Sequence, residues 1–147
     1  MEQDQGYLDK AKKSYINLIN KFDNFNSKIN LYNIYLKEKN YLESLDLVNN
    51  VLKIKNNLTN VIIDKAYINY KIKEYEVSKD ISYSILSKTK NNTKAINLIG
   101  LCLFKEKKYK ESLEYLFKGL KIDKEDLSLL NSIGDVYYEL RDLKNSE

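Results

Sequence analysis

Apolar residues along the chain recur at the spacing of an α-helix. A stripe of this kind follows each of three tyrosines, Tyr41, Tyr75 and Tyr109, and another precedes each of them. After Tyr109 the stripe consists of Leu113, Leu116, Phe117 and Leu120. Positions i, i+3, i+4 and i+7 lie on one face of a helix, which can then be buried against a neighbour. The pattern therefore predicts an all-α chain built from pairs of amphipathic helices.

The helical stripes repeat with a period of 34 residues. The positions that share this register are Tyr41, Tyr75 and Tyr109; Ser44, Ser78 and Ser112; and Gly100 and Gly134. A single spacing of this length has little meaning, but several spacings in one register indicate stacked structural repeats. We expect a right-handed α-α superhelix, a solenoid of antiparallel helix pairs with a 34-residue period.

Short charged segments separate the two helices of each pair. The predicted turns cover residues 37–40, 71–74, 105–108 and 139–142. Polar residues that cap helix starts cluster between pairs, at Asn56-Asn57, at Asn91-Asn92-Thr93 and from Asp123 to Asp126.

These boundaries divide the chain into repeats of one predicted domain, 1–147. Residues 25–58, 59–92 and 93–126 form full repeats; residues 1–24 form the second helix of a partial repeat, and residues 127–147 the first helix of another. Because both ends cut a repeat in half, we expect a fragment of a longer array. The repeat 59–92 carries Lys65 and Asn69 where apolar residues are typical, so local irregularity is expected there.

Small side chains recur where the two helices of a repeat are expected to meet. They are Ser44, Ser78, Ser112, Gly100 and Gly134. A larger side chain at such a contact would hold the helices apart. We therefore expect close helix approach at all five positions, and exposed apolar surface on the incomplete repeats, including Tyr137 and Leu140.

Composition removes most catalytic and metal-binding chemistry. The 147 residues include no His and one Cys, so His bases, Cys-His pairs and Cys/His zinc sites cannot be built. We expect no enzyme activity, no metal site and no cofactor. Cys102 lies within an apolar helical stripe and is expected to be a core residue.

Charge and hydropathy indicate neither a nucleic-acid partner nor a membrane. The net charge is +4 and the chain has a single arginine, Arg141, whereas nucleic-acid recognition favours arginine for planar, bidentate contacts. No apolar stretch approaches the ~20 residues of a membrane span. A signal-peptide pattern is also absent from the first residues, so we expect a cytoplasmic location.

The 34-residue helix-turn-helix pattern resembles the tetratricopeptide repeat. The segment from Leu98 to Phe104 resembles the first-helix signature Leu-Gly-x-x-Tyr of that family, and the segment from Asn131 to Tyr137 does so more closely. The segment from Tyr109 to Leu120 resembles the second-helix signature, with Ser112 and Gly119 where Ala is usual. The resemblance extends from about Tyr7 onward, although no Trp opens a repeat and no Pro closes one.

The resemblance implies a concave groove that is lined by the first helices and binds extended peptides or short helices. Transfer of the family's inward positions by register gives the candidate peptide-binding residues Asn33, Lys37, Tyr67, Tyr70, Lys71, Lys94, Asn97, Leu101, Phe104, Lys105, Asn131 and Tyr138. Asn amides can donate to and accept from a peptide backbone at once, and aromatic rings give large contact areas. A peptide with apolar anchors and an acidic group is the preferred ligand. The same residues are also compatible with codon bias, for Asn and Lys, and with core packing, for the aromatics.

One ligand of the family is not expected. Repeats that hold the carboxylate tails of heat-shock chaperones use a clamp of Lys and Asn side chains, to which Asn33 and Lys94 correspond. Ile29, Asp64 and Leu98 occupy the other clamp positions, and Asp64 would repel a carboxylate.

Two functions from different classes remain open. The chain is either a peptide-binding adaptor or scaffold module, or a structural spacer, self-assembly segment or regulatory repeat domain of a larger protein. In the second case self-association would use the exposed terminal helices.

Overall fold

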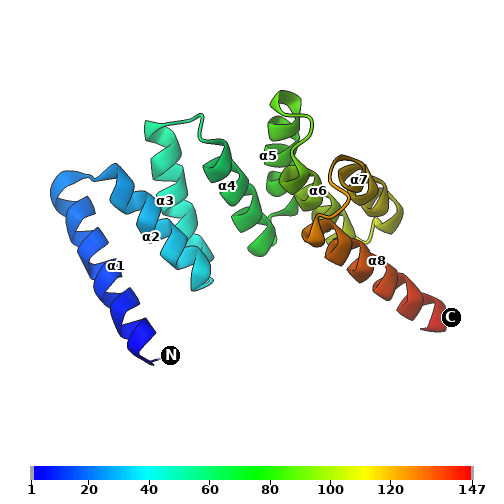
Figure 1. Cartoon of the computed structure of the whole chain (residues 1–147), viewed down its shortest axis with the longest axis horizontal. Coiled ribbons are helices and arrows are strands. Elements are labelled where there is room, and N and C mark those ends of the chain that lie inside the picture. Colours follow the sequence, from blue (N-terminus) through cyan, green and yellow to red (C-terminus); the bar gives the residue numbers. More distant parts are fainter. Residues whose placement is uncertain (1, 147) are drawn as a thin grey trace. The chain divides into compact units, whose positions relative to one another are not determined.

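The computed structural model describes the backbone of residues 2–146 and the side chains of residues 4–144, and this described part is helical without strands. Its helices are α1 (Glu2–Phe22), α2 (Phe25–Lys37), α3 (Tyr41–Ile54), α4 (Thr59–Lys71), α5 (Tyr75–Lys88), α6 (Thr93–Lys105), α7 (Tyr109–Ile122) and α8 (Leu127–Ser146). The predicted all-α class and the pairing of helices are confirmed (Figure 1).

Three of the predicted turns are present, and each uses the same backbone conformation. Lys39, Lys73 and Lys107 have φ angles of 63°, 70° and 63°, in the left-handed region that commonly ends a helix. Each lies two residues after the last residue of α2, α4 or α6. The turns reverse the chain after the first helix of each pair, so that the second helix can pack back against it.

The fourth predicted turn, at residues 139–142, is wrong, because α8 continues without interruption from Leu127 to Ser146. At the other three turns, helical backbone hydrogen bonds are interrupted, and the packing of a second helix against the first compensates for their loss. Here only a few described residues follow Asp142, too few to form such a helix. Leu140, which stands where two other turns have Glu38 and Glu106, packs instead against the core beside α8.

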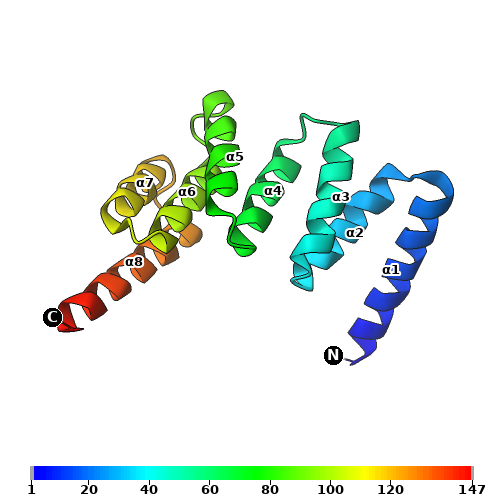
Figure 2. The ribbon, with the colours of Figure 1, turned by 180° about the vertical axis from the view of Figure 1, so that it is seen from behind.

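The chain forms two compact units, one that ends at Ile72 and one that begins at Lys73. In the first unit α1, α2, α3 and α4 pack in chain order, each against the next. In the second unit α5, α6, α7 and α8 do the same, and α8 also contacts α6 (Figure 2). The division falls inside the predicted repeat 59–92, and the assignment of the whole chain to one domain stays a prediction.

Each unit has its own apolar core. In the first unit the buried cluster consists of Tyr32, Val48, Val51, Val61 and Ile68, with partly buried side chains from α2 and α3 packed around it. In the second unit the cluster consists of Leu116, Leu129, Ile133 and Val136. The predicted stripes include Val48, Val51, Leu116 and Ile133 of these residues. The stripes predicted for the first helices omit Tyr32, Val61, Ile68, Leu129 and Val136, so the periodicity identifies the buried face better on the second helices than on the first.

Close helix approach is confirmed at Gly100. A Cβ atom on Gly100 would lie 2.5 Å from Cδ2 of Leu116, whose side chain is fully buried. The Ser112 hydroxyl donates to the Gly100 carbonyl over 2.7 Å, and Ser44 donates in the same way to the Tyr32 carbonyl over 3.0 Å. These bonds satisfy the buried hydroxyls and join the two helices of a repeat.

Gly134 differs from the expectation, because a Cβ atom there would meet nothing within 4 Å. Gly100 is enclosed by the second helix of its own repeat, α7, whereas no described helix covers the corresponding face of α8. The expected contact at Gly134 is therefore wrong for this structure, and the position is exposed.

Three of the four helix starts between repeats have a side-chain cap. Asn24 and Asn92 accept hydrogen bonds from the backbone N–H groups of Ser27 and Ala95, and Asp126 accepts from that of Leu129. Successive caps are 68 and 34 residues apart, both multiples of the repeat length. Leu58 holds the remaining position, before α4, and makes no such bond, so the expected cap by Asn56 and Asn57 is wrong. Those two residues precede the cap position, and Leu58 packs against the first core instead.

Candidate functional site

The predicted peptide-binding residues of the first unit lie on α2 and α4. Tyr67, Tyr70 and Lys71 are grouped on α4, where the Lys71 Nζ atom lies 5.2 Å from the ring centroid of Tyr67 and 5.7 Å from that of Tyr70. A cation over an aromatic face is attracted by the negative potential of the ring. The three side chains thus form one amphipathic cluster at the C-terminal end of α4.

A hydrogen bond connects α2 to α4 beside this cluster. The Tyr32 hydroxyl donates to Oδ2 of Asp64 over 3.1 Å. Burial, and then the negative charge of Asp64, raise the pKa of Tyr32 to about 12, so the phenol keeps the proton that it donates. Asp64, which stands in a position of the chaperone clamp, therefore accepts a hydrogen bond that joins α2 to α4.

Asn33 on α2 is half-buried, and its amide nitrogen donates to the Ile29 carbonyl of the same helix over 2.9 Å. Lys37, at the end of α2, is exposed. The bond to Ile29 occupies one of the two N–H groups of the Asn33 amide. The same side chain also interacts with the Tyr32 hydroxyl, whose pKa it tends to lower.

In the second unit the predicted residues lie on α6 and α8, which contact each other directly. The Ser132 hydroxyl lies 2.8 Å from Oδ1 of Asn97 and 2.8 Å from the carbonyl oxygen of Ser128. Because a hydroxyl has one proton, it donates to only one of these acceptors at a time. The Asn97 side chain therefore lies at the junction of the two first helices.

Four further predicted residues are exposed on the same two helices. Lys94 and Lys105 are exposed on α6, and Asn131 and Tyr138 are exposed on α8, with 66 % of Tyr138 accessible. Leu101 is partly buried on α6. The surface thus combines cationic, amide and aromatic groups within one compact unit.

Phe104 has a mixed environment. Its ring centroid lies 5.9 Å from that of Tyr109, and its side chain packs against the second core. The Lys105 Nζ atom lies 5.1 Å from the same ring. Phe104 therefore contributes to packing as well as to the candidate surface.

The candidate residues fall into two groups, one on each compact unit. The group on the first unit contains Asn33, Lys37, Tyr67, Tyr70 and Lys71. The group on the second unit contains Lys94, Asn97, Leu101, Phe104, Lys105, Asn131 and Tyr138. The members of each group lie on two first helices, and the second group is the larger.

Sequence reasoning missed an ion-pair cluster in the second unit. The Lys79 Nζ atom lies 2.6 Å from Oε1 of Glu106 and 2.8 Å from Oε1 of Glu76, and Lys108 lies 2.9 Å from Oε2 of Glu106. Burial tends to raise the pKa of Glu106, but Lys108 and Lys79 outweigh it and lower that pKa. Burial likewise tends to lower the pKa of Lys79, but Glu106 and Glu76 reverse the effect and raise it. The cluster therefore stays charged and joins α5 to the turn between α6 and α7.

A similar pair occurs in the first unit. The Lys12 Nζ atom of α1 lies 2.7 Å from Oε1 of Glu38, in the turn between α2 and α3. Glu38 and Glu106 are 68 residues apart, two repeat lengths. The recurrence of Glu in this turn, with Lys in the preceding second helix, is the sequence signal that could have identified both pairs.

The remaining reactive group is in the core. Cys102 is fully buried, as expected, and burial raises the pKa of its thiol. Among the described residues there is no group of three His, Cys, Asp or Glu side chains that could hold a metal ion. No helix between residues 2 and 146 is long and apolar enough to cross a membrane.

No protein-family model matches the sequence, and no curated protein is similar to it in sequence. Solved structures, however, share its fold. A tetratricopeptide repeat protein from Parabacteroides merdae ATCC 43184 is similar with a TM-score of 0.83 and 16% identity, over 95% of this chain and 55% of that chain. MamA from Desulfovibrio magneticus RS-1 is similar with a TM-score of 0.77 and 16% identity, over 97% of this chain and 81% of that chain.

Peptide-bound proteins also share the fold. The first tetratricopeptide domain of Spaghetti (RPAP3), bound to the HSP90 peptide SRMEEVD, is similar with a TM-score of 0.65 and 17% identity, over 75% of this chain and 87% of that chain. At these identities the likeness concerns the fold, which is that of the tetratricopeptide repeat.

Proposed function

We propose that this chain, which has the tetratricopeptide-repeat fold, is a non-catalytic interaction module that binds an extended segment of a partner protein. The observation that carries the proposal is the surface of α6 and α8, where Asn97 meets Ser132 and Lys94, Lys105 and Tyr138 are exposed around them. Surfaces that combine aromatic anchors with a few polar groups are favourable for protein recognition. The module would act as an adaptor or scaffold, and we place it in the cytoplasm.

The charges of this surface favour an acidic or amide-rich partner with apolar anchors. Lys94 and Lys105 supply positive charge, and the Asn97 and Asn131 amides suit a peptide backbone. A chaperone tail is not the preferred ligand, although proteins of this fold bind such peptides. In this chain Leu98 is buried and Asp64 accepts a hydrogen bond from Tyr32, so neither position offers a cation to a terminal carboxylate.

A capture experiment tests the proposal. The immobilised chain and a Lys94→Ala/Asn97→Ala/Lys105→Ala variant are exposed to lysate of the source cells, and captured proteins are identified by mass spectrometry. The matched control is Lys110→Ala/Glu114→Ala/Lys118→Ala, on exposed positions of α7. We expect a partner that is retained by the wild type and the control and lost by the α6 variant.

Equal capture by all three chains would overturn the α6–α8 surface as the binding site. It would favour the second candidate, a structural spacer or self-assembly segment of a larger protein. Thermal melts of the three chains show whether loss of capture reflects loss of folding. Purified partner segments can then be titrated by fluorescence anisotropy to obtain a dissociation constant.

A further inference from the structure

One face of α8 is uncovered, although the same face of α6 is buried. Leu130, Gly134 and Tyr137 of α8 stand 34 residues after Ile96, Gly100 and Leu103 of α6. On α6 all three positions are buried, and Leu116 of α7 packs against Gly100. On α8, by contrast, Leu130 is 43% exposed, Tyr137 is 51% exposed and Gly134 faces open space. This face of α8 therefore has room for a packed helix, and no helix among the described residues occupies it.

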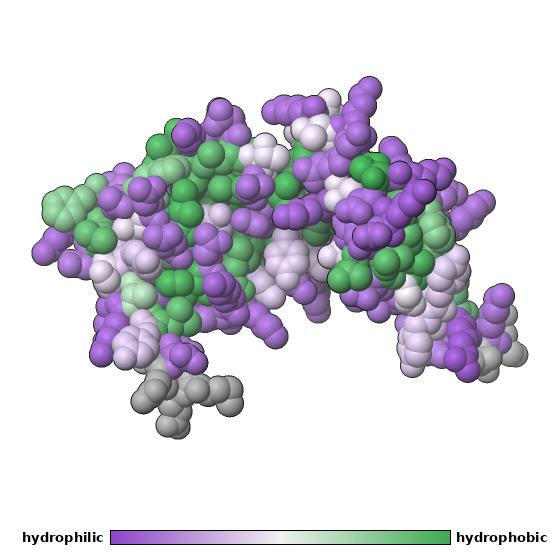
Figure 3. All heavy atoms as spheres, viewed as in Figure 1, coloured by the Kyte–Doolittle hydropathy of each residue, from purple (hydrophilic) through white to green (hydrophobic). Residues whose placement is uncertain are grey.

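The neighbouring helix α7 also carries an exposed aromatic side chain, Phe117. Tyr83 of α5 contacts Tyr115 of α7, with ring centroids 6.1 Å apart. Phe117 holds the same position on α7 that Tyr83 holds on α5, and it is 42% exposed. Figure 3 shows apolar side chains at the surface of this part of the second unit.

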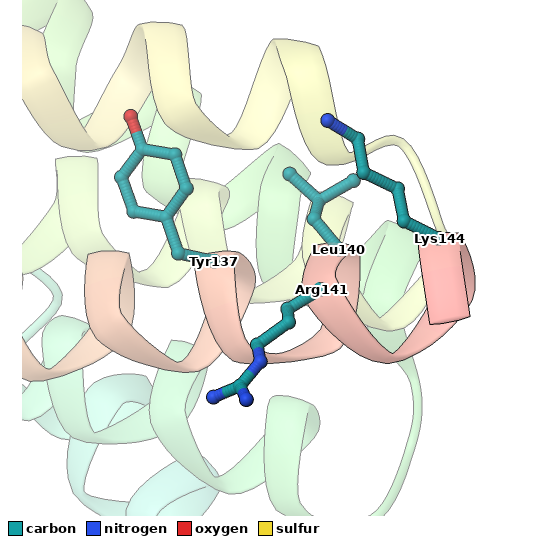
Figure 4. A pocket seen from close by; sticks show the side chains of 4 residues that line it. All are labelled: Tyr137, Leu140, Arg141 and Lys144. Atoms are coloured by element: carbon teal, nitrogen blue, oxygen red, sulfur yellow. The ribbon is translucent and has the colours of Figure 1, made fainter.

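A surface hollow of about 420 Å³ lies on the C-terminal half of the α8 face. It is lined by Tyr137, Leu140, Arg141 and Lys144. In Figure 4 Tyr137, Leu140 and Lys144 extend to one side of α8 and Arg141 to the other, so that basic groups flank the apolar ones. An occupant of this face should therefore present apolar side chains together with acidic groups.

Helix α1 of a second copy does not meet this requirement. It is a second helix without a first helix of its own, and its residues correspond by register to those of α7. Where α7 presents Leu116 and Gly119 to its neighbours, α1 presents Ser14 and Asn17, which are exposed. A polar face of this kind would leave the apolar side chains of the α8 face without apolar partners.

Helix α8 of a second copy does present both apolar side chains and acidic groups. Asp123, Glu125 and Asp126, with Lys124 among them, precede the start of α8. Near its end Arg141 and Lys144 line the hollow, whereas Glu139 and Asp142 do not. Leu130, Gly134, Tyr137 and Lys144 follow one another at i, i+4, i+7 and i+14, along one side of the helix, and Arg141 borders the hollow from the other side. Two copies that cross antiparallel at Gly134 bring the basic end of each helix to the acidic start of the other.

We infer that the uncovered face of α8 is a self-association surface on which a second copy of this chain packs its own α8, antiparallel and related by a two-fold axis. Gly134 lies at the crossing, where the lack of a side chain permits close approach, and Leu130 and Tyr137 pack on either side of it. Because both copies use the same face, the assembly closes as a dimer and does not extend into a filament. The inference does not depend on the α6 surface proposed above.

The first test is the mass of the 147-residue chain in solution. The monomer has a mass of 17.3 kDa. Light scattering and sedimentation velocity over a range of protein concentrations are expected to show a species of twice this mass. A monomer at every concentration, or open-ended growth with concentration, would overturn the inference.

A glycine pair supplies matched variants. Gly134→Gln places a side chain where the monomer has free space, and Gly6→Gln does the same on α1. Both changes favour the helix of the monomer, so neither is expected to impair folding. We expect Gly134→Gln to weaken dimerisation by about tenfold or more, a factor that corresponds to 1.4 kcal/mol, and Gly6→Gln to leave it unchanged. Equal dimerisation by both variants would refute the crossing at Gly134.

Charge reversal tests the orientation. Arg141→Glu/Lys144→Glu makes the end of α8 acidic, and Asp123→Lys/Glu125→Lys makes its start basic. Each variant alone should remain monomeric, because like charges then face each other across the two-fold axis. An equimolar mixture should form a heterodimer, because both charge contacts become favourable at once. A mixture that stays monomeric would contradict the antiparallel arrangement.

Partner binding distinguishes the self-association surface from the candidate binding surface on α6. If the Gly134→Gln monomer still binds the partner, the two surfaces act independently.

Discussion

Lys79 and Glu106 form an ion pair, with the Nζ and Oε1 atoms 2.6 Å apart, at positions that hold Leu45 and Ile72 one repeat earlier. The Lys79 side chain is only 8% exposed and that of Glu106 16%. The second unit therefore has an ion pair at two positions where the preceding repeat has two apolar residues. A buried charge that loses its partner is costly, whereas an apolar pair of similar volume can replace a buried ion pair at little cost.

Replacement of Lys79 alone should therefore destabilise the protein more than replacement of the pair. We expect Lys79→Leu to lower the free energy of unfolding by about 2–4 kcal/mol, because it removes the deeply buried cation beside Glu106. The double variant Lys79→Leu/Glu106→Ile, which copies the residues found one repeat earlier, should recover most of this loss. Urea unfolding followed by circular dichroism measures both values. Additive losses in the double variant would show that the two side chains do not interact.

The same cluster predicts a loss of stability in acid. The pKa of Glu106 lies below its ordinary value of 4.5, because Lys108 and Lys79 outweigh the effect of burial. A carboxylate whose pKa is lowered by folding contributes stability above its unfolded pKa and loses that contribution as the pH falls through its folded pKa. We expect wild type to be more stable than Glu106→Gln at pH 7, and the difference to shrink steadily below pH 4.5.

Urea titrations of both proteins between pH 7 and pH 3 measure this difference directly. Glu111→Gln is a suitable control, because Glu111 is exposed on α7. Its effect on the free energy of unfolding should be small at every pH. A constant difference between wild type and Glu106→Gln across the range would show that the carboxylate charge contributes nothing.

Three helical glycines provide an internal comparison of packing against helix propensity. A Cβ on Gly100 would lie 2.5 Å from buried Leu116, whereas a Cβ on Gly6 or Gly134 would meet nothing within 4 Å. Ala favours a helix over Gly by roughly 0.5–1 kcal/mol, so Gly6→Ala and Gly134→Ala should raise the free energy of unfolding. Gly100→Ala should lower it by about 1–3 kcal/mol, the usual cost of overpacking. Thermal melts at low protein concentration rank the three variants, and a stabilising Gly100→Ala would mean that Leu116 moves aside freely.

The 34-residue register predicts the parts of the fold that depend on local sequence. The first helices α2, α4 and α6 end at predicted turns, and Gly100 packs against α7 as its small size suggests. These features depend on short-range periodicity and on side-chain volume, which a single sequence displays. Gly134 has the same register but no covering helix, so the same reasoning gives the wrong contact there.

Other features depend on contacts that periodicity does not encode. The bond between Asn97 and Ser132 requires α6 and α8 to meet at one particular rotation of each helix. The ion pair of Lys79 with Glu106 joins residues on different repeats, and its turn position holds Ile72 one repeat earlier. A search for residues that recur in every repeat overlooks a pair that is ionic in one repeat and has apolar residues in the one before it. The candidate site was accordingly predicted as a set of positions, whereas its bonds were visible only in the structure.

The capping residue of α6 gives a prediction with an adjacent control. The Asn92 side chain accepts a hydrogen bond from the backbone N–H of Ala95 over 3.0 Å and so satisfies one of the unpaired N–H groups at the helix start. Asn92→Ala should lower the free energy of unfolding by about 1 kcal/mol. Asn91→Ala, one residue earlier and exposed, should change it by less than about half as much. Urea unfolding and amide hydrogen exchange at Ala95 measure the two effects. If both variants lost the same stability, the cap could not be assigned to Asn92, and the polar residues before α6 would act only through their general preference for turns.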